Sequence, residues 1–457
     1  MIINKYLFFF IFSTPVIILQ GLIVCKLYYM FDYGINTFFI FFQAFISAIF
    51  SSYLLKAAIQ KILENERFDR KFINKKNEYK SIKITIVYCL IALILIFIAS
   101  RNGVMDYKAY LNHWTIINQG LDPWTGTDNV YLPIHNVFAP LASINNSLPK
   151  IVFVFIFAIP MYLSSIFPLN FKREMDIFSK IKIFAVFAFS PFCILITSYY
   201  GLNDTPVAGL IVLSLYLSLS NHKKQNSLLS GISLALATMI KVYPIFIAPL
   251  FIFRKKRIDI TFFTSYFLSI IGIFFSSIII WGKSTLKPFL WATEMHSKHL
   301  SFFNFFRRIV GINFDEFSVY AMAIVLFIAL VILIKNKIDL LPSVILTLAL
   351  GFTFYKIGHP QYFLFFFAVS PMTIRYIYDK NLKSNGSLFI SFLMWICFLN
   401  FYQTFYTLAC HMFHGFPNYL RGLGSLPYLL LSIFMLNELF KLFKKDPKAL
   451  SSKSICS

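Results

Sequence analysis

Charged residues are scarce in this chain. Only 13% of its residues are Asp, Glu, Lys or Arg, against roughly 25% in a typical soluble domain. Hydrophobic residues make up 58% of the 457 residues, and the mean hydropathy is +0.71. An ordinary soluble domain is therefore excluded, and an integral membrane protein is indicated.

Cysteine pairs and nucleotide-binding motifs are also lacking. The six cysteines are scattered without CxxC spacing, so neither a disulfide framework nor a metal cluster is indicated. No P-loop is present, and no GxGxxG segment follows a strand. Nucleotide chemistry inside the cell is not supported. No cofactor and no metal site is predicted, although the question of a divalent metal stays open.

Acidic residues are few beside basic ones. The chain has 19 Asp and Glu against 42 Lys and Arg, which gives a net charge of +23. Such an excess can indicate a nucleic-acid partner, but here the basic residues lie mainly in short loops between apolar runs. The positive-inside bias and anionic headgroups account for them there. Membrane lipids, and not nucleic acid, are the expected partner.

Long apolar runs dominate the chain. They are roughly 20 residues long, enough to cross a hydrocarbon core about 30 Å thick as helices, and they recur without a repeat period. We predict an all-α polytopic membrane protein with about 14 membrane segments, two of them short or broken. The first run, residues 6–29, is too long for a signal-peptide core. It is kept as a span, and the chain is expected to begin at Met1.

Three parts are expected along the chain: an N-terminal hairpin with a basic loop, a core with two long outer loops, and a C-terminal hairpin with a cytoplasmic tail. Their ranges are 1–81, 82–376 with outer loops 101–149 and 282–316, and 377–457. The basic loop that ends the first part should face the cytoplasm. A span near 82–100 then carries the first outer loop to the extracytoplasmic side. Further spans are expected near 6–28, 34–57, 150–169, 181–199, 258–281, 318–334, 339–355, 361–376, 387–402 and 425–440.

Residues 228–257 depart from this pattern. Basic loops precede and follow the segment, and Lys241 lies in its middle, shortly before Pro244. Two half-length helices that meet at a proline-broken apex fit it better than one span. A lysine near mid-membrane costs roughly 2.5–3.5 kcal/mol to insert, so it should face protein, water or an anionic ligand.

The stretch 101–150 is the longest polar break and the expected place of the chemistry. Its interleaved Trp and Tyr residues predict short amphipathic helices at the membrane interface. Asp106 is the first carboxylate after the preceding span. Partial desolvation there raises its basicity and lets it take a proton from a hydroxyl nucleophile. A helix N-cap is the alternative role.

Four groups of residues resemble motifs of the GT-C membrane glycosyltransferases, in matching order. They are Asp106-Tyr107 with Gly120-Leu121-Asp122-Pro123-Trp124 and Tyr131-Leu132-Pro133, then Asn203-Asp204, then Lys241-Val242-Tyr243-Pro244, and finally His359-Pro360-Gln361-Tyr362-Phe363. The similarity covers roughly residues 85–375 and is nearest to the polyprenyl-phosphate-mannose-dependent mannosyltransferases of the phosphoinositol-mannoside and GPI types. Two features differ. A DxD motif is missing at Asp106, which leaves metal dependence open, and two spans precede the loop where one is usual, which leaves the role of residues 1–80 open.

The resemblance implies a GT-C-like fold and an inverting transfer of a hexose, mannose by default. The donor would be a polyprenyl-phosphate-linked sugar and the acceptor lipid- or glycan-linked, with the active site on the extracytoplasmic face of a bacterial inner membrane. Asp106 would act as general base. The donor phosphate would be bound by Lys241, His359, Arg307 and Arg308. Donor or acceptor contacts would come from Tyr107, Asp122, Trp124, Tyr131, His135, Asn203, Asp204, Tyr243, Gln361 and Tyr362.

Structural alternatives stand beside these roles. Lys241 has the alternative of snorkelling to an interface, and His359 that of capping a span. For Arg307 and Arg308 the alternative is an anchor to lipid headgroups. Asp122 stands before a proline, which is a common turn device. Interfacial aromatic residues are usually belt residues.

Two other function classes fit a polytopic chain. A transporter or lipid flippase also uses broken helices and intramembrane charges, but no second broken segment pairs with 228–257, and the polar residues concentrate in outer loops. A polysaccharide polymerase or ligase also has many spans and basic outer loops. Essential arginines, in place of an essential acidic residue, would favour that class.

Overall fold

A computed structural model describes the central part of the chain. The described residues are 106–125, 129–167, 169–171, 175–188, 190–220, 224–254, 257–379 and 395–401, with positions 49, 53, 56, 426, 428–430, 432, 433 and 437. The predicted N-terminal hairpin with its basic loop, the span near 82–100 and most of the C-terminal hairpin lie outside these residues.

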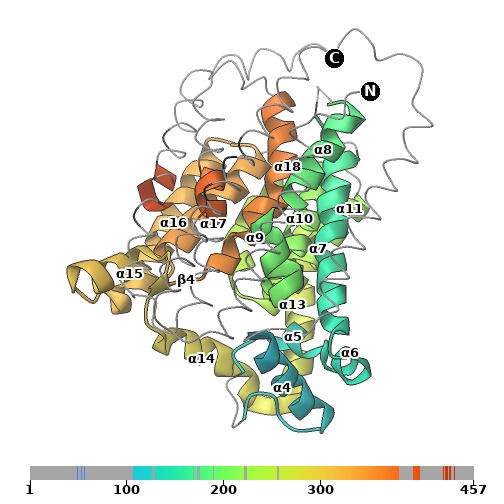
Figure 1. The fold of residues 1–457 in the computed structure, drawn as a ribbon, viewed down its shortest axis with the longest axis vertical. Helices are drawn as coiled ribbons and strands as arrows, with labels where there is room; N and C mark the ends of the chain where they lie inside the picture. Colours follow the sequence, from blue (N-terminus) through green and yellow to red (C-terminus); the bar gives the residue numbers. More distant parts are fainter. Residues whose placement is uncertain are drawn as a thin grey trace, which may run out of the picture.

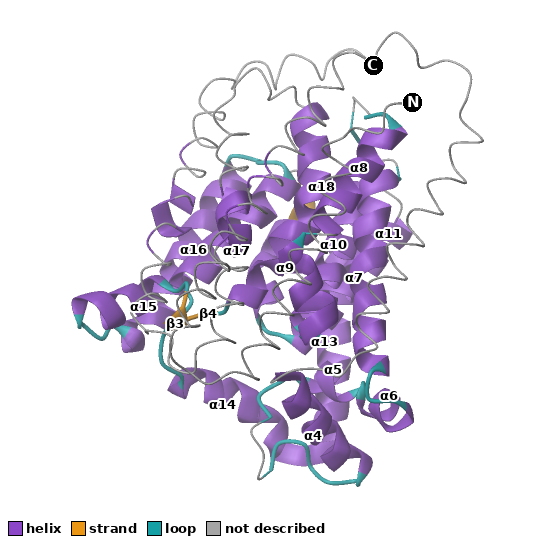
Figure 2. Cartoon of the chain, viewed as in Figure 1, coloured by secondary structure: helices purple, strands orange, loops and turns teal. Residues whose placement is uncertain are grey.

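Helices make up most of the described chain, and the few strands are two residues long (Figure 2). The elements are α4 Asp106–Asn118, α5 Pro133–Asn136, α6 Ala139–Ile144, α7 Leu148–Ile166, α8 Ile177–Ala188, α9 Pro191–Cys193, η2 Ile194–Tyr200, α10 Asp204–Leu219, α11 Lys224–Ile240, η3 Tyr243–Ile247, α12 Ala248–Ile252, β1 Phe253–Arg254, β2 Arg257–Ile258, α13 Ile260–Trp281, η4 Gly282–Leu286, α14 Lys287–Glu294, β3 Lys298–His299, α15 Phe302–Phe305, η5 Phe306–Val310, η6 Asp315–Phe317, α16 Ser318–Lys335, α17 Leu340–Phe354, β4 Ile357–Gly358, η7 Pro360–Phe363 and α18 Leu364–Asp379. The prediction of a mostly helical chain is confirmed, whereas the number of about 14 membrane segments stays a prediction.

Three helical stretches in the described part are long and apolar enough to cross a membrane: Leu148–Ile166, Ile260–Leu290 and Asp315–Lys335. They coincide with spans predicted near 150–169, 258–281 and 318–334. On α13 and α16, large apolar side chains such as Leu268 and Phe327 remain exposed. Contiguous exposed apolar surface of this kind fits contact with lipid, in agreement with a membrane protein.

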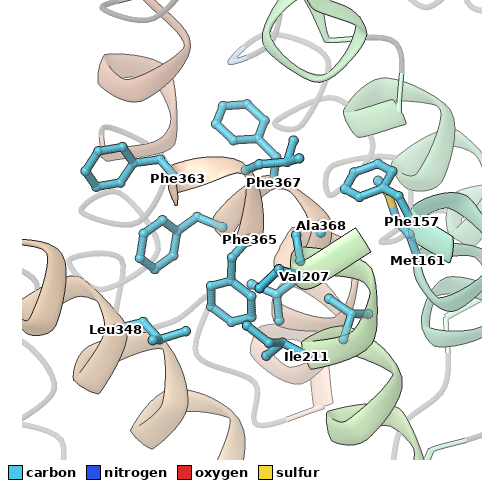
Figure 3. Packing of buried hydrophobic residues seen from close by; sticks show 14 of the residues in the cluster. Phe157, Met161, Val207, Ile211, Leu348, Phe363, Phe365, Phe367 and Ala368 are labelled. Carbon is cyan, nitrogen blue, oxygen red and sulfur yellow. The ribbon is translucent and has the colours of Figure 1, made fainter. Parts of the chain in front are cut away.

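Helix α18 forms the centre of the core. Its side chains are buried along most of its length, and Figure 3 shows Phe365, Phe367 and Ala368 of α18 gathered in one group with Val207 and Ile211 of α10 and Phe157 of α7. Burial of a Phe side chain stabilises a fold by about 1.5–3 kcal/mol. The phenylalanine-rich sequence of α18 therefore holds α7 and α10 in place around it.

Small residues bring α10 and α11 close to their neighbours. A Cβ at Gly209 of α10 would overlap the backbone of α7, and one at Gly231 of α11 would overlap the backbone of α13. The Ser230 hydroxyl lies 2.8 Å from those of Ser214 and Ser218, which joins α11 to α10. Small residues allow this close packing in membrane helices. Helices α10 and α11 consequently form a tight antiparallel pair, so the start of one lies beside the end of the other.

The break predicted within residues 228–257 is present, but its two arms are unequal and not both half-length: α11 has 17 residues, and η3 and α12 have 5 each. Helix α11 ends at Ile240, and after Lys241 and Val242 the chain continues as the short helices η3 and α12. Pro244 has no backbone N–H and cannot continue the hydrogen-bond ladder of α11. β1 then pairs antiparallel with β2 before α13 begins. Lys241 therefore lies at the apex, where the chain reverses.

Short helices cover one end of the helical bundle. α4, α5, α6 and α14 lie together at the lower end in Figure 1, away from the upper ends of α8 and α18. The first three agree with the prediction of short helices within residues 101–149, whereas the outer position of this loop stays a prediction. In the second predicted outer loop, residues 282–316 and below called the second outer loop, β3 pairs parallel with β4, which ties this loop to the segment before η7. We call this end of the molecule the site end.

Candidate functional site

A buried ion pair joins two helix ends at the site end. α10 begins at Asp204, and Lys241 directly follows α11. The Lys241 Nζ donates to Asp204 Oδ2 at 2.7 Å, and the side chains are 13% and 1% exposed, respectively. A carboxylate at a helix N-terminus and an ammonium at a helix C-terminus each complement the helix dipole. Lys241 therefore finds its anionic partner within the chain itself.

Several buried polar atoms around this pair have no hydrogen-bond partner within the described part of the chain. They are both ring nitrogens of His135, Asn203 Nδ2 and the Tyr243 hydroxyl, while Asp204 Oδ1 makes no hydrogen bond to another residue. An unsatisfied buried polar atom costs about 1–3 kcal/mol. A group of them in one place therefore indicates a position where a ligand or ordered water binds. We call Asp204, Lys241, Asn203, His135 and Tyr243 the buried polar cluster.

Tyrosine rings surround the buried polar cluster. Tyr110 and Tyr131 lie with their ring centroids 4.9 and 4.5 Å from that of His135, and Tyr110 donates its hydroxyl to Asn203 Oδ1 at 3.2 Å. The Tyr362 ring lies 5.3 Å from that of Tyr243. The cluster is thus enclosed by aromatic surface, of which Tyr131 is only partly buried.

The charges within the buried polar cluster balance. Burial lowers the pKa of His135 well below its ordinary value, and the charges of His113 and Lys241 act in the same direction. His135 is therefore neutral at physiological pH. The remaining charges are the carboxylate of Asp204 and the ammonium of Lys241, which cancel.

Helix α4 presents Asp106 at the edge of this cluster. Tyr107, Tyr110 and Trp114 are spaced three and four residues apart, so they share one helix face, and each is at most 1% exposed. Asp106 begins α4 and is exposed. Its charge interacts with Asp204. A carboxylate open to solvent thus borders a buried polar interior.

The tyrosines next to Asp106 keep their protons. Burial raises the pKa of Tyr110 and of Tyr131, and the negative charge of Asp106 raises both further. Both phenols are therefore neutral hydrogen-bonding groups at physiological pH. Asp106 therefore lies beside two phenols that can donate hydrogen bonds.

The second outer loop adds positive charge beside Asp106. The pairing of β3 with β4 lets Lys298 N donate to Lys356 O at 2.8 Å. The charge of Lys298 interacts with Arg307 and with Asp106. Burial and, after it, the charge of Arg307 lower the pKa of Lys298, whereas Asp106 opposes the shift. We call Lys298, Arg307, Arg308 and Lys356 the loop cation cluster.

Arg307 braces this loop. Its Nη2 donates to Ser297 O at 2.7 Å, and its Nη1 lies 4.0 Å from Asp315 Oδ2. The same carboxylate oxygen accepts from Ser297 N at 2.9 Å and lies 3.3 Å from His296 Nδ1. Arg308 is exposed. Residues 282–316 contain five Lys and Arg against three Asp and Glu, so the loop keeps an excess of positive charge.

Most of the residues predicted from the motifs meet at the site end. Asp106, Tyr131, His135, Asn203, Asp204, Lys241, Tyr243 and Tyr362 lie in or around the buried polar cluster, as the contacts above describe. His359 precedes η7 and makes no side-chain capping hydrogen bond. Its ring lies 5.5 Å from that of Tyr362, and Gln361 follows half-buried in η7. The last motif thus borders the same site.

Three other predicted residues make the contacts of structural residues. Asp122 accepts from Trp124 N at 2.9 Å and from Thr125 Oγ1 at 2.6 Å, which is the turn geometry of its alternative role. Burial raises the pKa of Asp122, but these hydrogen bonds outweigh it and lower the pKa overall. Trp124 is buried and donates Nε1 to Tyr131 O at 3.0 Å. Tyr107 is buried and donates to a backbone carbonyl, that of Asn146, at 2.6 Å.

The motifs did not identify Tyr110, Lys150 or Lys298. Spacing along α4 could have identified Tyr110. Lys150 is fully buried and donates to Tyr199 O at 3.1 Å, which supports the loop before Asp204. At the start of a span, however, it resembles an interfacial lysine. Lys298 lies outside any motif, and the pairing of β3 with β4 alone brings it to the site.

Comparison with known proteins gives one family match. No curated protein matches the chain. Residues 135–355 match the family model described as Glycosyltransferase family 87. The matched range contains the whole buried polar cluster and the second outer loop, whereas Asp106 and His359 lie outside it. This match spans just under half of the chain, and it supports a glycosyltransferase activity for a protein similar to this GT-C-like family of membrane enzymes.

Proposed function

We propose that the protein is an inverting glycosyltransferase that moves a hexose from a polyprenyl-phosphate-linked donor to a lipid- or glycan-linked acceptor. The observation that carries the proposal is the position of Asp106, an exposed carboxylate between the buried polar cluster and the positive charge of Lys298. The family match supports glycosyl transfer in general. The polyprenyl phosphate donor and mannose as the default hexose rest on the motif resemblance.

In the proposed step the acceptor hydroxyl oxygen attacks the anomeric carbon of the donor sugar. The bond between that carbon and the phosphate oxygen breaks, and its electron pair leaves with the phosphate. The hydroxyl proton passes to the Asp106 carboxylate, which acts as general base. The products are an inverted glycoside and polyprenyl phosphate. The exposure of Asp106 leaves room for an acceptor to approach it.

The leaving phosphate requires positive charge, and the loop cation cluster supplies it. Lys298 and Arg307 are the cations that we assign to the phosphate, with His359 bordering them. A charge-assisted hydrogen bond to phosphate strengthens as negative charge accumulates there in the transition state. Lys241, expected from sequence to bind this phosphate, has its charge already neutralised by Asp204. We therefore assign it an indirect role, through the orientation of Asp204.

The distribution of basic residues supports an extracytoplasmic active site. Arg254 and Arg257 follow the arm that leads away from the Lys241 apex, and Lys335 ends α16, which starts near the second outer loop. These residues therefore lie toward the end opposite the site. Basic loops face the cytoplasm in most membrane proteins, but the loop cation cluster places basic residues at the site end as well. The assignment therefore rests mainly on the motif resemblance, from which we propose that the site end faces outward at the plasma membrane of a bacterium.

Replacement of the proposed base tests this function. Asp106→Asn should lower the transfer rate by roughly 10²–10⁴ and leave donor affinity unchanged, because the amide keeps the shape but cannot take the proton. The assay uses purified full-length protein and a short-chain polyprenyl-phosphate mannose. Glu316→Gln, which alters an exposed acid of the second outer loop, is the matched control and should keep full activity. More than half of wild-type activity in Asp106→Asn would contradict the mechanism.

A further inference from the structure

We infer that the buried polar cluster is the subsite for the donor sugar ring, in which Asp204 accepts hydrogen bonds from sugar hydroxyls and Lys241 is a positioning residue for Asp204. This inference rests on the proposed function. It assigns the two halves of the donor to different parts of the site, the sugar to the buried polar cluster and the phosphate to the loop cation cluster.

Charge is the first argument. The buried polar cluster is neutral, because the Asp204 and Lys241 charges cancel at 2.7 Å and burial keeps His135 unprotonated. An anion placed there would repel the Asp204 carboxylate and compete with it for Lys241. A neutral ligand is neither repelled by Asp204 nor in competition with it for Lys241.

Hydrogen-bonding capacity is the second argument. The atoms without partners include a donor, Asn203 Nδ2, and an acceptor, Asp204 Oδ1, together with groups that do both, Tyr243 and His135. An ionised phosphate ester only accepts hydrogen bonds and would leave the Asp204 oxygen unmatched. A sugar hydroxyl donates and accepts, so adjacent hydroxyls of a hexose can satisfy donor and acceptor together.

Aromatic surface is the third argument. Tyr131 packs against His135 and Tyr362 packs against Tyr243, and the Lys241 ammonium lies 4.8 Å from the centre of the Tyr362 ring. Tyrosine rings offer an apolar face to the C–H groups of a pyranose. Tyr131, Lys241 and His359 are only partly buried, and Tyr131 interacts with the charge of the exposed Asp106. The sugar enters from that edge, which brings its anomeric carbon toward the base.

Lys241 acts through Asp204 in this arrangement. Its ammonium is held by one carboxylate oxygen and by the Tyr362 ring, and it fixes the rotamer that leaves the other oxygen without a partner. A cation–π contact adds about 0.5–2 kcal/mol to this restraint. Lys241→Arg should therefore preserve recognition of the sugar, since the positive charge remains.

Donor analogues test the subsite directly. Full-length protein in lipid nanodiscs is assayed with short-chain polyprenyl-phosphate mannose, its 2-, 3-, 4- and 6-deoxy analogues, and sugar-free polyprenyl phosphate as competitor. Wild type should discriminate strongly against at least one deoxy donor, because a buried site that pairs with a hydroxyl rejects an analogue without it. Asp204→Asn should lower kcat/KM for the intact donor at least tenfold. The ratio of kcat/KM between the intact donor and the rejected deoxy donor should fall by a similar factor. The inhibition constant of the sugar-free competitor should stay within threefold of wild type.

Tyr243→Phe is the second variant, since it removes only an unpartnered hydroxyl and should fold. It should lower the ratio of kcat/KM between the intact donor and one deoxy donor about two- to tenfold. Unchanged discrimination in both variants would overturn the inference, as would an equal loss of affinity for the sugar-free competitor. Failure of the proposed function looks different. In that case wild type transfers no sugar from the donor, or Asp106→Asn stays active.

Discussion

The buried polar cluster and the loop cation cluster lie close together, yet each surrounds its lysine with a different set of charges. Lys241 is buried against Asp204, so its charge is cancelled within the fold. Lys298 lies among other cations, with an excess of positive charge around it. The two lysines carry the same ammonium, but only the second has charge left for a ligand. The partner of a charged side chain, and not its residue type or depth, indicates what it binds.

Loss of the Lys241 charge should produce the largest effect on stability. If it does not, the difference between the two lysines is wrong. Lys241→Met leaves the Asp204 carboxylate buried without a counter-ion, which should lower the free energy of unfolding by about 3–5 kcal/mol. Lys298→Met should change it by less than about 1 kcal/mol, because that side chain is only half-buried. Thermal unfolding in detergent or nanodiscs measures both. As a control, the double variant Lys241→Met with Asp204→Asn should recover part of the lost stability. Equal destabilisation by Lys241→Met and Lys298→Met would contradict the proposed difference between the two lysines.

Sequence predicted those parts of the fold that depend on local pattern. Apolar runs of span length predicted α7, α13 and α16, and a lysine before Pro244 predicted the broken segment, because each signal lies within one short window. The partner of Lys241 was not predicted. It depends on the antiparallel packing of α10 against α11, which joins residues far apart in the chain.

The site was predicted unevenly for the same reason. Motif order identified Asp106 and Asp204, which lie near enough for the charge of Asp106 to raise the pKa of Asp204's neighbour Tyr110 and that of Tyr131. It did not identify Lys298, because a pairing of two-residue strands leaves no recognisable pattern in the sequence. Trp124 appeared suited to stacking on a sugar, yet it is buried in the turn that Asp122 forms. Residue type was visible in the sequence, whereas the direction of the side chain was not.

Replacement of Lys298 should affect the donor phosphate and so sharpen the comparison. Lys298→Ala should raise the inhibition constant of sugar-free polyprenyl phosphate about tenfold or more, since a charge-assisted hydrogen bond contributes roughly 1.5–3 kcal/mol. Lys298→Arg should restore most of the binding. Lys283→Ala, an exposed lysine of the same outer loop, is the matched control. If Lys298→Ala binds sugar-free polyprenyl phosphate with wild-type affinity, the donor phosphate does not bind at this loop.

The smallest expected effect concerns pH. The pKa of His135 is lowered in the folded protein. As the pH falls, the imidazole therefore becomes protonated in the unfolded chain before it does so in the folded protein. The contribution of His135 to stability is thus present above the unfolded pKa of about 6.5 and is lost as the pH falls toward the folded pKa. The free energy of unfolding should decrease by up to about 1.4 kcal/mol per pH unit in that window. Unfolding curves of wild type and His135→Gln at several pH values measure this, and identical slopes would show that His135 is not held neutral.

An experimental structure of the full-length protein with a non-hydrolysable short-chain polyprenyl-phosphate hexose tests the division of the site most directly. We expect the phosphate beside Lys298 and Arg307, and the sugar ring over Tyr131 with a hydroxyl within hydrogen-bond distance of Asp204. Density for the phosphate on Lys241, with the Asp204 pair broken and the sugar in the second outer loop, would contradict it.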